Sequence, residues 1–498
     1  MLFSLGLFVS LTLSKILRLG IIKLTLVSAL DFSYLCGQMG RQITTLSLGT
    51  DPLSRLLPRY AVPAIIAMTS TSLFNIIDSV FIGHGVGALA ISGMALTMPI
   101  MNVASAFGSL VGVGAAAVTS IRLGQGNKRS AEHILGNVIL LNVVIGLTIG
   151  ILGLVFLDDI LYFFGASDRT VPYARDFMHV ILAGNVITHL YLSLNEMLRA
   201  SGYPQKSMHI MLISVAVNCV LNPLFIFKFG WGIRGSACAT VIAQTVALSI
   251  SLHHFMRPDS FLRFKRGIFR FDGRIVGSII SVGLAPFLVN ICTSIVVIFV
   301  NKALKTYGGD LNIGAYGIIN RVVMLFLMVV FGLNQGMQPI VGYNYGAKQY
   351  DRVLKALKIT IICAVCVTTA GFLVSRLLPR QVAMLFVGGD DADAAEMIDA
   401  VAYGMRYVMI MFWAVGFQVV TGNFFQYIGK AKRAILISLT RQMLFLVPLL
   451  IVLPPKLGVL GVWISMPIAD SMSIILAATL LFFQIRRLRR SPDEEKSI

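Results

Sequence analysis

"SLFNIIDSVFIGHG", residues 72–85, is apolar almost throughout, yet it carries Asn75 and Asp78 near its middle. In a chain with many similar runs, such a segment predicts a membrane-spanning helix. A carboxylate at the centre of a bilayer costs roughly 2.5–3.5 kcal/mol on insertion scales. We therefore expect Asp78 to have either a function or a bonded partner.

The composition extends this interpretation to the whole chain. Of its 498 residues, 57% are hydrophobic and only 13% are charged, whereas about 25% of residues are charged in a typical soluble domain. Apolar runs of about 18 or more residues recur along the chain, and each is long enough to cross a bilayer as a helix. The sequence therefore predicts an all-α polytopic membrane protein.

The net charge of +19 is concentrated in short loops and in the tail "QIRRLRR", residues 484–490. This distribution is typical of the positive-inside rule, in which basic loops stay in the cytoplasm. We therefore expect an anionic lipid surface, and not nucleic acid, as the partner of these charges. Basic and non-basic connections alternate along the chain, which predicts that both termini are cytoplasmic.

Apolar runs and the breakers between them predict twelve helices. Their ranges are about 58–84, 88–121, 131–157, 173–200, 207–229, 232–256, 274–304, 312–342, 352–378, 397–428, 433–453 and 458–485. The chain then divides into an N-terminal extension (1–57), a first lobe (58–257), a basic linker (258–273), a second lobe (274–485) and a cytoplasmic tail (486–498). We expect residues 1–38 to be a mis-called start or a dispensable amphipathic extension.

The two predicted lobes resemble each other. Gly114 and Gly124 are ten residues apart, and so are Gly336 and Gly346. The second pair lies 222 positions after the first. Because each repeat has an even number of helices, the repeats share one orientation and are related by a pseudo-two-fold axis along the membrane normal. In transporters of this design the substrate lies between the halves, near the middle of the membrane.

The first lobe carries three polar residues inside its apolar runs, and one of them, Asp78, is a candidate ion-binding carboxylate. Away from water, a carboxylate such as Asp78 favours its neutral form, or it binds Na⁺ together with neutral oxygen ligands. Asn218 and Asn222 are four apart, hence on one helical face, and Pro223 frees a backbone carbonyl and can bend the helix. The alternatives are a carboxylate merely capped by Asn75 and nearby hydroxyls, and asparagines that only join helices.

The second lobe has polar residues of its own inside apolar runs. Those that could line a cavity or join helices are Arg321, Gln335, Gln338, Tyr343, Asn344, Arg441 and Asp470. No nucleophile–base constellation, P-loop or metal-ligand spacing accompanies them, so we expect neither an enzyme nor an ATP-driven pump. No metal site and no organic cofactor are expected, and H⁺ or Na⁺ would act as the coupling ion.

Several stretches together resemble the multidrug and toxic compound extrusion (MATE) family, in its DinF/MepA-like bacterial branch. They are "DSVFIGHGVGALAISGMAL" (78–96), "SLNEMLRASGYPQKSM" (193–208), "VNCVLNPLFIF" (217–227), "IGAYGIINRV" (313–322), "GLNQGMQPIVGYNYGAKQYDRV" (332–353) and "FFQYIGKAKRAILISLTRQ" (424–442). The resemblance implies twelve helices in two lobes, location in the cell membrane, and efflux of cationic or amphipathic compounds by H⁺ or Na⁺ antiport. We expect a monomer.

The resemblance also implies roles for individual residues. Asp78 matches the aspartate that binds the coupling cation, and Asn218, Asn222 and Thr240 match its companions. Some relatives have a second acid where this chain has Asn222, a departure that leaves the identity of the ion open. Arg321 and Arg441 match basic positions of the branch; we expect them to bond carbonyls or Asp470, with direct substrate binding as the alternative.

The function predicted from the sequence is therefore secondary active multidrug export by alternating access. The alternative is a flippase or exporter of a lipid-linked or specialised metabolite substrate. An anionic lipid-linked substrate would favour a cavity lined by several basic residues, and the helix interiors supply few. A membrane scaffold would not need polar residues at mid-membrane in matched helices.

Overall fold

The computed structural model describes residues 47–86, 88–163, 168, 170–265, 267–386 and 392–489. Within these ranges the side chains of residues 75–77, 79–80, 83–84, 88–92, 95–96, 310 and 392–394 are not described. From Leu48 onward the described residues form one compact unit. The expectations for residues 1–38 and for the last residues of the tail therefore lie outside the described residues.

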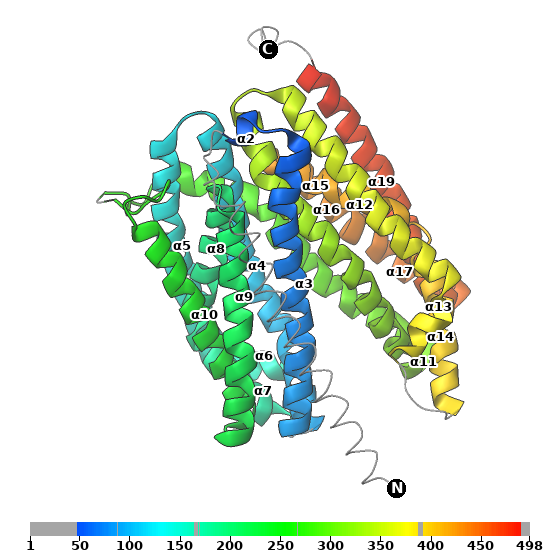
Figure 1. The fold of residues 1–498 in the computed structure, drawn as a ribbon. Coiled ribbons are helices and arrows are strands. Elements are labelled where there is room, and N and C mark those ends of the chain that lie inside the picture. Colours follow the sequence, from blue (N-terminus) through cyan, green and yellow to red (C-terminus); the bar gives the residue numbers. More distant parts are fainter. Residues whose placement is uncertain are drawn as a thin grey trace, which may run out of the picture. The chain divides into compact units, whose positions relative to one another are not determined.

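Every regular element of the described chain is helical (Figure 1). The first half contains α2 (Ser47–Thr50), α3 (Leu53–Gly85), α4 (Ala88–Gly124), α5 (Lys128–Val155), α6 (Leu157–Phe163), α7 (Val171–Ala183), α8 (Asn185–Ala200), α9 (Pro204–Pro223), the π-helix η1 (Leu224–Lys228) and α10 (Gly232–Met256). The second half contains α11 (Gly273–Gly346), α12 (Tyr350–Leu377), α13 (Pro379–Met384), α14 (Ala392–Val408), α15 (Phe412–Tyr427), α16 (Ala431–Leu439), the π-helix η2 (Thr440–Leu446), α17 (Val447–Val452), α18 (Pro454–Leu457) and α19 (Val459–Arg489).

The number of membrane-length helices agrees with the sequence. Among the described residues nine helices are long and apolar enough to cross a bilayer, and eleven if each bent pair counts as one span. α3, with 33 residues, is a further long helix. Gly309 divides α11 into two spans, since its φ of 70° is a conformation that glycine adopts without strain. The prediction of an all-α polytopic protein is confirmed.

Two predicted spans are bent in a way that the sequence did not indicate. The span expected at 173–200 is broken between α7 and α8, which meet at an angle of 56°. The break falls at Gly184, where an added Cβ would lie 2.7 Å from a methyl group of Val241 on α10. The bend thus depends on close packing between helices, which apolar periodicity does not report. A similar break of 55° separates α14 from α15.

The helices of each half pack mainly with one another. Figure 1 shows α8 beside α4 and α5, and α12 beside α15, as the contacts between these elements require. One core joins α4, α5, α8 and α10, and another joins α11, α14, α15 and α19. Between the halves, α11 packs along α3 and α4.

Glycines make that contact between the halves reciprocal. A Cβ added at Gly124 on α4 would collide with the carbonyl oxygen of Tyr343 on α11, and one added at Gly346 would collide with that of Ile121. Ile121 and Tyr343 are themselves 222 positions apart, as are Gly124 and Gly346. Each glycine thus contacts the repeat equivalent of the residue that the other glycine contacts, as a two-fold axis between the halves requires.

A second pair of contacts, ten residues earlier in α4 and α11, repeats the pattern and includes α3. A Cβ at Gly114 would lie 2.9 Å from the backbone nitrogen of Gly283, and one at Gly336 would lie 2.5 Å from the Cα of Ala61. Ala61 and Gly283 are again 222 positions apart. The two halves therefore approach backbone to backbone at symmetry-related positions.

Candidate functional site: a buried carboxylate cluster and a central cavity

Asp78 lies where three helices of the first half meet. Its side chain is buried on α3, with 7% of the residue exposed. Its Oδ1 accepts a hydrogen bond from the side-chain amide of Asn222 on α9 and another, of 2.9 Å, from the hydroxyl of Ser236 on α10. Asn222 and Ser236 are fully buried. The carboxylate therefore has partners on two neighbouring helices.

Asn218 and Thr240 continue this cluster one helical turn away. The amide of Asn218 donates to the Thr240 hydroxyl over 3.1 Å, which joins α9 to α10 a second time. The Oδ1 atoms of Asn218 and Asn222 are buried and accept no hydrogen bond from the described residues. A buried carbonyl oxygen without a donor favours a proton donor, a water molecule or a cation. Together with Asp78 these oxygens form the kind of donor set that hard cations prefer.

The helix that carries both asparagines changes its winding directly after them. α9 ends at Pro223, and the chain continues as the π-helix η1. Proline has no N–H group to bond the preceding turn, so the backbone there is free to rewind. Single π-turns in helices occur frequently at functional sites. The bend that Pro223 predicted therefore takes the form of a change in helix type.

Ser236 is the member of the cluster that the sequence did not identify. It precedes Thr240 by four residues, so the two side chains lie on one face of α10. This spacing could have indicated it once Thr240 was chosen. The side chain of Asn75, which was expected to cap Asp78, lies outside the described residues.

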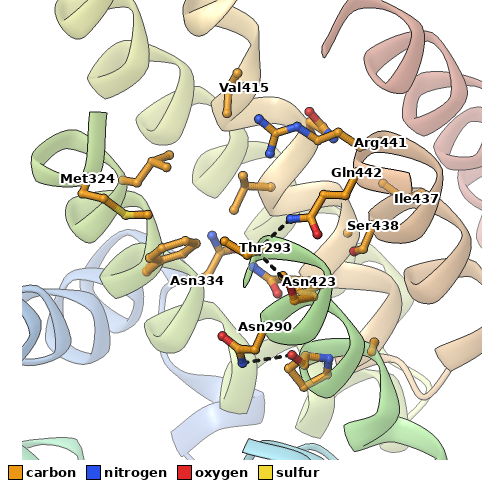
Figure 2. A pocket seen from close by; sticks show the side chains of 18 of the residues that line it. Asn290, Thr293, Met324, Asn334, Val415, Asn423, Ile437, Ser438, Arg441 and Gln442 are labelled. Carbon is orange, nitrogen blue, oxygen red and sulfur yellow. Dashed lines mark hydrogen bonds between the residues drawn. The ribbon is translucent and has the colours of Figure 1, made fainter. Parts of the chain in front are cut away.

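A cavity of about 540 Å³ lies among the helices of the second half and reaches the first. Figure 2 shows Asn334 of α11, Asn423 of α15, and Arg441 and Gln442 of η2 projecting into this space. The first half contributes Met68, Ser109, Val113 and Glu196 to its wall. Asp78, Asn218, Asn222 and Thr240 do not line it. The carboxylate cluster and the cavity are therefore separate features of the fold.

Carboxamide side chains dominate the polar wall of the cavity. They are Asn290, Asn320, Asn334, Gln335, Gln338, Gln418, Asn423, Gln426 and Gln442. Four of them have a buried atom without a hydrogen-bond partner among the described residues: Oδ1 of Asn334, Oε1 of Gln418, Nε2 of Gln426 and Oε1 of Gln442. Buried polar atoms normally have partners, so water or a bound molecule would satisfy these groups.

The charged groups of the cavity wall are already paired. Arg441, in η2, donates from Nε to Asp470 on α19 over 2.7 Å. Glu196 forms an ion pair with Arg199 on α8. The described wall thus offers hydrogen-bonding groups and apolar surface more than net charge.

The second-half residues expected from the sequence fall into two groups. Gln335, Gln338, Arg441 and Asp470 line the cavity. Tyr343 and Asn344 lie elsewhere: Tyr343 packs against the core of the first half, and Asn344 donates to the backbone oxygens of Leu48 and Ile340.

Arg321 does not follow the expectation that it joins the second lobe. Its side chain is exposed on α11, and none of the described residues hydrogen-bonds or pairs with it. Asp470, its expected acidic partner, bonds Arg441 instead. The sequence pattern placed both arginines in apolar helices, but it did not report which helix face each occupies.

Comparison with known proteins identifies the family. The MatE family model matches residues 63–224 and 282–452, which together cover most of the chain. The chain belongs to the MatE family. The two matched segments correspond to the two halves of the fold, and the predicted resemblance is confirmed. The protein is a multi-pass membrane protein.

Curated relatives match over nearly their whole length. The chain is 26% identical over 434 residues to the multidrug export protein MepA of Staphylococcus haemolyticus, which covers 87% of this chain and 94% of that protein. It is 26% identical over 439 residues to MepA of Staphylococcus aureus strain NCTC 8325 / PS 47, with the same coverage.

Solved structures agree with the helical arrangement. The MATE multidrug transporter DinF-BH, solved in complex with R6G, matches with a TM-score of 0.81 and 33% identity, over 87% of this chain and 96% of that one. A MATE transporter described in an outward-facing conformation matches with a TM-score of 0.84 and 24% identity, over 90% and 99%. The prediction of twelve helices in two lobes is confirmed.

Proposed function

We propose that this MatE protein is a secondary active multidrug exporter that exchanges H⁺ or Na⁺ for drug, with Asp78 as the ion-coupling carboxylate. The observation that carries the proposal is the buried Asp78 side chain, bonded from α9 and α10. Relatives named as multidrug export proteins over most of their length support the substrate class.

Coupling follows from the hydrogen bonds that Asp78 can make. When ionised, its carboxylate accepts from both Asn222 and Ser236. A proton or Na⁺ on the carboxylate changes which of these bonds are favourable, because a protonated oxygen donates and a cation occupies lone pairs. The packing of α3 against α9 and α10 must then adjust.

α3 connects this cluster to the contact between the halves. The same helix carries Ala61 and Ile65, which lie against Gly336 and Gly332 of α11. A shift of α3 driven by Asp78 would therefore change the packing of α3 against α11 of the second half. For coupling, ion and drug must favour different states of this contact.

The reciprocal glycine contacts support a state closed on one side of the membrane. Gly124 directly precedes the basic turn "QGNKR", and Gly346 directly precedes "AKQYDR". Because basic connections remain in the cytoplasm, this closed end is the cytoplasmic one, and both termini are cytoplasmic. Separation of the halves at these glycines would open the cavity to the cytoplasm for loading.

The wall of the cavity favours drug export over the alternative, transport of an anionic lipid-linked substrate. Such a substrate requires basic groups that are free to bond phosphate. Among the described residues that line the cavity, the basic side chain is Arg441, and its Nε already bonds Asp470. The carboxamides and apolar side chains suit amphipathic small molecules. We further propose a monomer in the cell membrane, without enzymatic activity or an organic cofactor.

Efflux from cells tests the proposal. In a host that lacks its own exporters, the wild-type protein should lower accumulation of a cationic dye and raise drug resistance. The Asp78→Asn variant should be present in the membrane in equal amount, but it should neither lower dye accumulation nor raise drug resistance. Undiminished efflux by Asp78→Asn would contradict the role of this carboxylate.

A further inference from the structure

A second cavity lies at the start of α5, apart from the sites described above. It has a volume of about 600 Å³ and lies between α5 and the linker that precedes α11. Its lining residues are Lys128, Arg129, Glu132, His133, Lys265, Gly267, Ile268 and Arg270. Four of these are cations and one is an acid, and that acid, Glu132, already bonds Lys265 over 2.7 Å. The cavity therefore carries an excess of positive charge.

The linker is held firmly against α5, so the cavity has fixed walls. A Cβ added at Gly136 would collide with the backbone oxygen of Ile268. The Asn137 amide donates to the backbone oxygen of Arg270 over 3.1 Å and its Oδ1 accepts from the backbone N–H of Asp272 over 3.0 Å. These contacts lie on the same face of α5 as the Glu132–Lys265 pair.

The cations that complete the cavity present their side chains outward. Lys128, Arg129 and Arg270 are exposed, and the Lys128 ammonium lies 4.5 Å from the centre of the Phe261 ring. Arginine and lysine held together around a concave surface match a phosphate group, to which arginine donates two parallel hydrogen bonds. The chemistry of the cavity is therefore that of a phosphate site.

Apolar side chains beside the cavity distinguish a lipid from a free phosphate. Phe269 and Phe271 flank Arg270 in the chain, and they are 48% and 65% exposed. Exposed phenylalanines next to basic residues are typical of segments that lie at the membrane interface. Basic pockets on the cytoplasmic side of transmembrane helices are known to bind anionic lipid headgroups.

We propose that this cavity binds the phosphate headgroup of an anionic phospholipid of the cytoplasmic leaflet. Arg129 and Arg270 bond the phosphate, and Phe269 and Phe271 enter the region of the acyl chains. The site uses no residue of the carboxylate cluster or of the central cavity, so it goes beyond the transport function proposed above.

The test measures lipid binding to the purified protein by native mass spectrometry. The probes are phosphatidylglycerol, phosphatidylcholine and inorganic phosphate, and the variant is Arg129→Gln/Arg270→Gln. The matched control is Lys355→Gln/Lys358→Gln, which removes two exposed charges from the first turns of α12. Each basic side chain contributes about 1 kcal/mol at an anionic surface, so the variant should bind phosphatidylglycerol about 30-fold more weakly than wild type.

The expected result is preference for phosphatidylglycerol over phosphatidylcholine in wild type and in the control, and loss of that preference in the cavity variant. Phe269→Ser/Phe271→Ser should also weaken lipid binding. Equal loss in the cavity variant and the control would overturn the proposal in favour of diffuse charge. Displacement of the lipid by inorganic phosphate at equal concentration would overturn it in favour of a free-phosphate site.

Discussion

Gly124 and Gly346 each lie against the backbone of the other's helix, at positions related by the internal repeat. Because neither site has room for a Cβ, the two halves approach more closely here than side chains would allow. Both glycines precede basic turns, so the contact closes the end of the molecule that we assign to the cytoplasm. The geometry of this contact makes the balance between open and closed states sensitive to single methyl groups.

Gly346→Ala should destabilise the closed contact by about 1–3 kcal/mol, since an extra methyl in a fully packed site forces the backbone apart. Gly124→Ala should have a similar effect because its surroundings are equivalent. The measurement is the labelling rate of a cysteine at Ser120, a buried position whose Cβ lies close to Gly342. In a background without native cysteines, cytoplasmic maleimide should label it faster in both variants.

The control for that measurement lies in the same helix. Gly277→Ala and Gly317→Ala add the same methyl group to α11, where no atom lies within 4 Å of the new Cβ. They should leave the labelling rate unchanged. Equal acceleration by all four substitutions would show that an added methyl group anywhere on these helices has the effect, and would contradict a specific role for the contact between the halves.

Ser236→Ala should weaken ion-coupled transport. It removes one of the two hydrogen bonds that Asp78 accepts, and a bond to a charged group contributes about 1.5–3 kcal/mol. Transport driven by an ion gradient should therefore fall about tenfold or more. Ser251→Ala is the matched control: it lies buried on the same helix, but among the described residues its hydroxyl bonds the carbonyl of Ala247 and not Asp78. A similar loss in both would contradict a specific role for Ser236.

Arg441→Ala should lower the stability of the second half markedly. It leaves the Asp470 side chain, which is 9% exposed, without its ion-pair partner, and an uncompensated buried charge costs about 3–5 kcal/mol. Thermal unfolding in detergent measures the effect. Arg380→Ala breaks the exposed pair with Asp399 and should cost about 0.2–1 kcal/mol. If both variants unfold alike, Arg441 does not stabilise the fold through Asp470.

Asn334→Leu should impair transport with little loss of stability. Its Oδ1 is unpaired at the cavity wall and its amide donates to the Val330 carbonyl one turn earlier over 2.9 Å, so the substitution removes one hydrogen bond and should cost about 1 kcal/mol of unfolding free energy or less. The KM for a hydrogen-bonding substrate should rise. Asn344→Leu is the opposite case on the same arm of α11, because Asn344 bonds Leu48, Ile340 and Arg352. It should cost about 1–3 kcal/mol of stability. Unchanged KM in Asn334→Leu would contradict a substrate-binding role for this amide.

The sequence predicts the membrane fold well because apolar runs and loop charges report directly on insertion in the bilayer. The repeat of glycines at 222 positions even indicates the residues that make the reciprocal contact. The bend at Gly184 escapes such an approach, because it depends on close packing against Val241 of another helix. At η1, by contrast, Pro223 indicated a local distortion of the helix before the structure showed its form.

The candidate sites show the same division. Asn218, Asn222 and Thr240 could be chosen from helical spacing and family resemblance, and spacing also leads to Ser236. The cavity wall could not be predicted in the same way. Asn290, Asn334 and Asn423 are far apart in the chain and become neighbours only when α11 and α15 pack together.

The central claim is that ion binding at Asp78 drives export, and transport into inverted vesicles tests it most directly. Uptake of a cationic dye is followed with a proton gradient and a sodium gradient imposed separately, for wild type and Asp78→Asn. The account predicts uptake under one gradient in wild type and its loss in Asp78→Asn, with equal amounts of inserted protein. Uptake that persists in Asp78→Asn, or no uptake by inserted wild-type protein under either gradient, would contradict it.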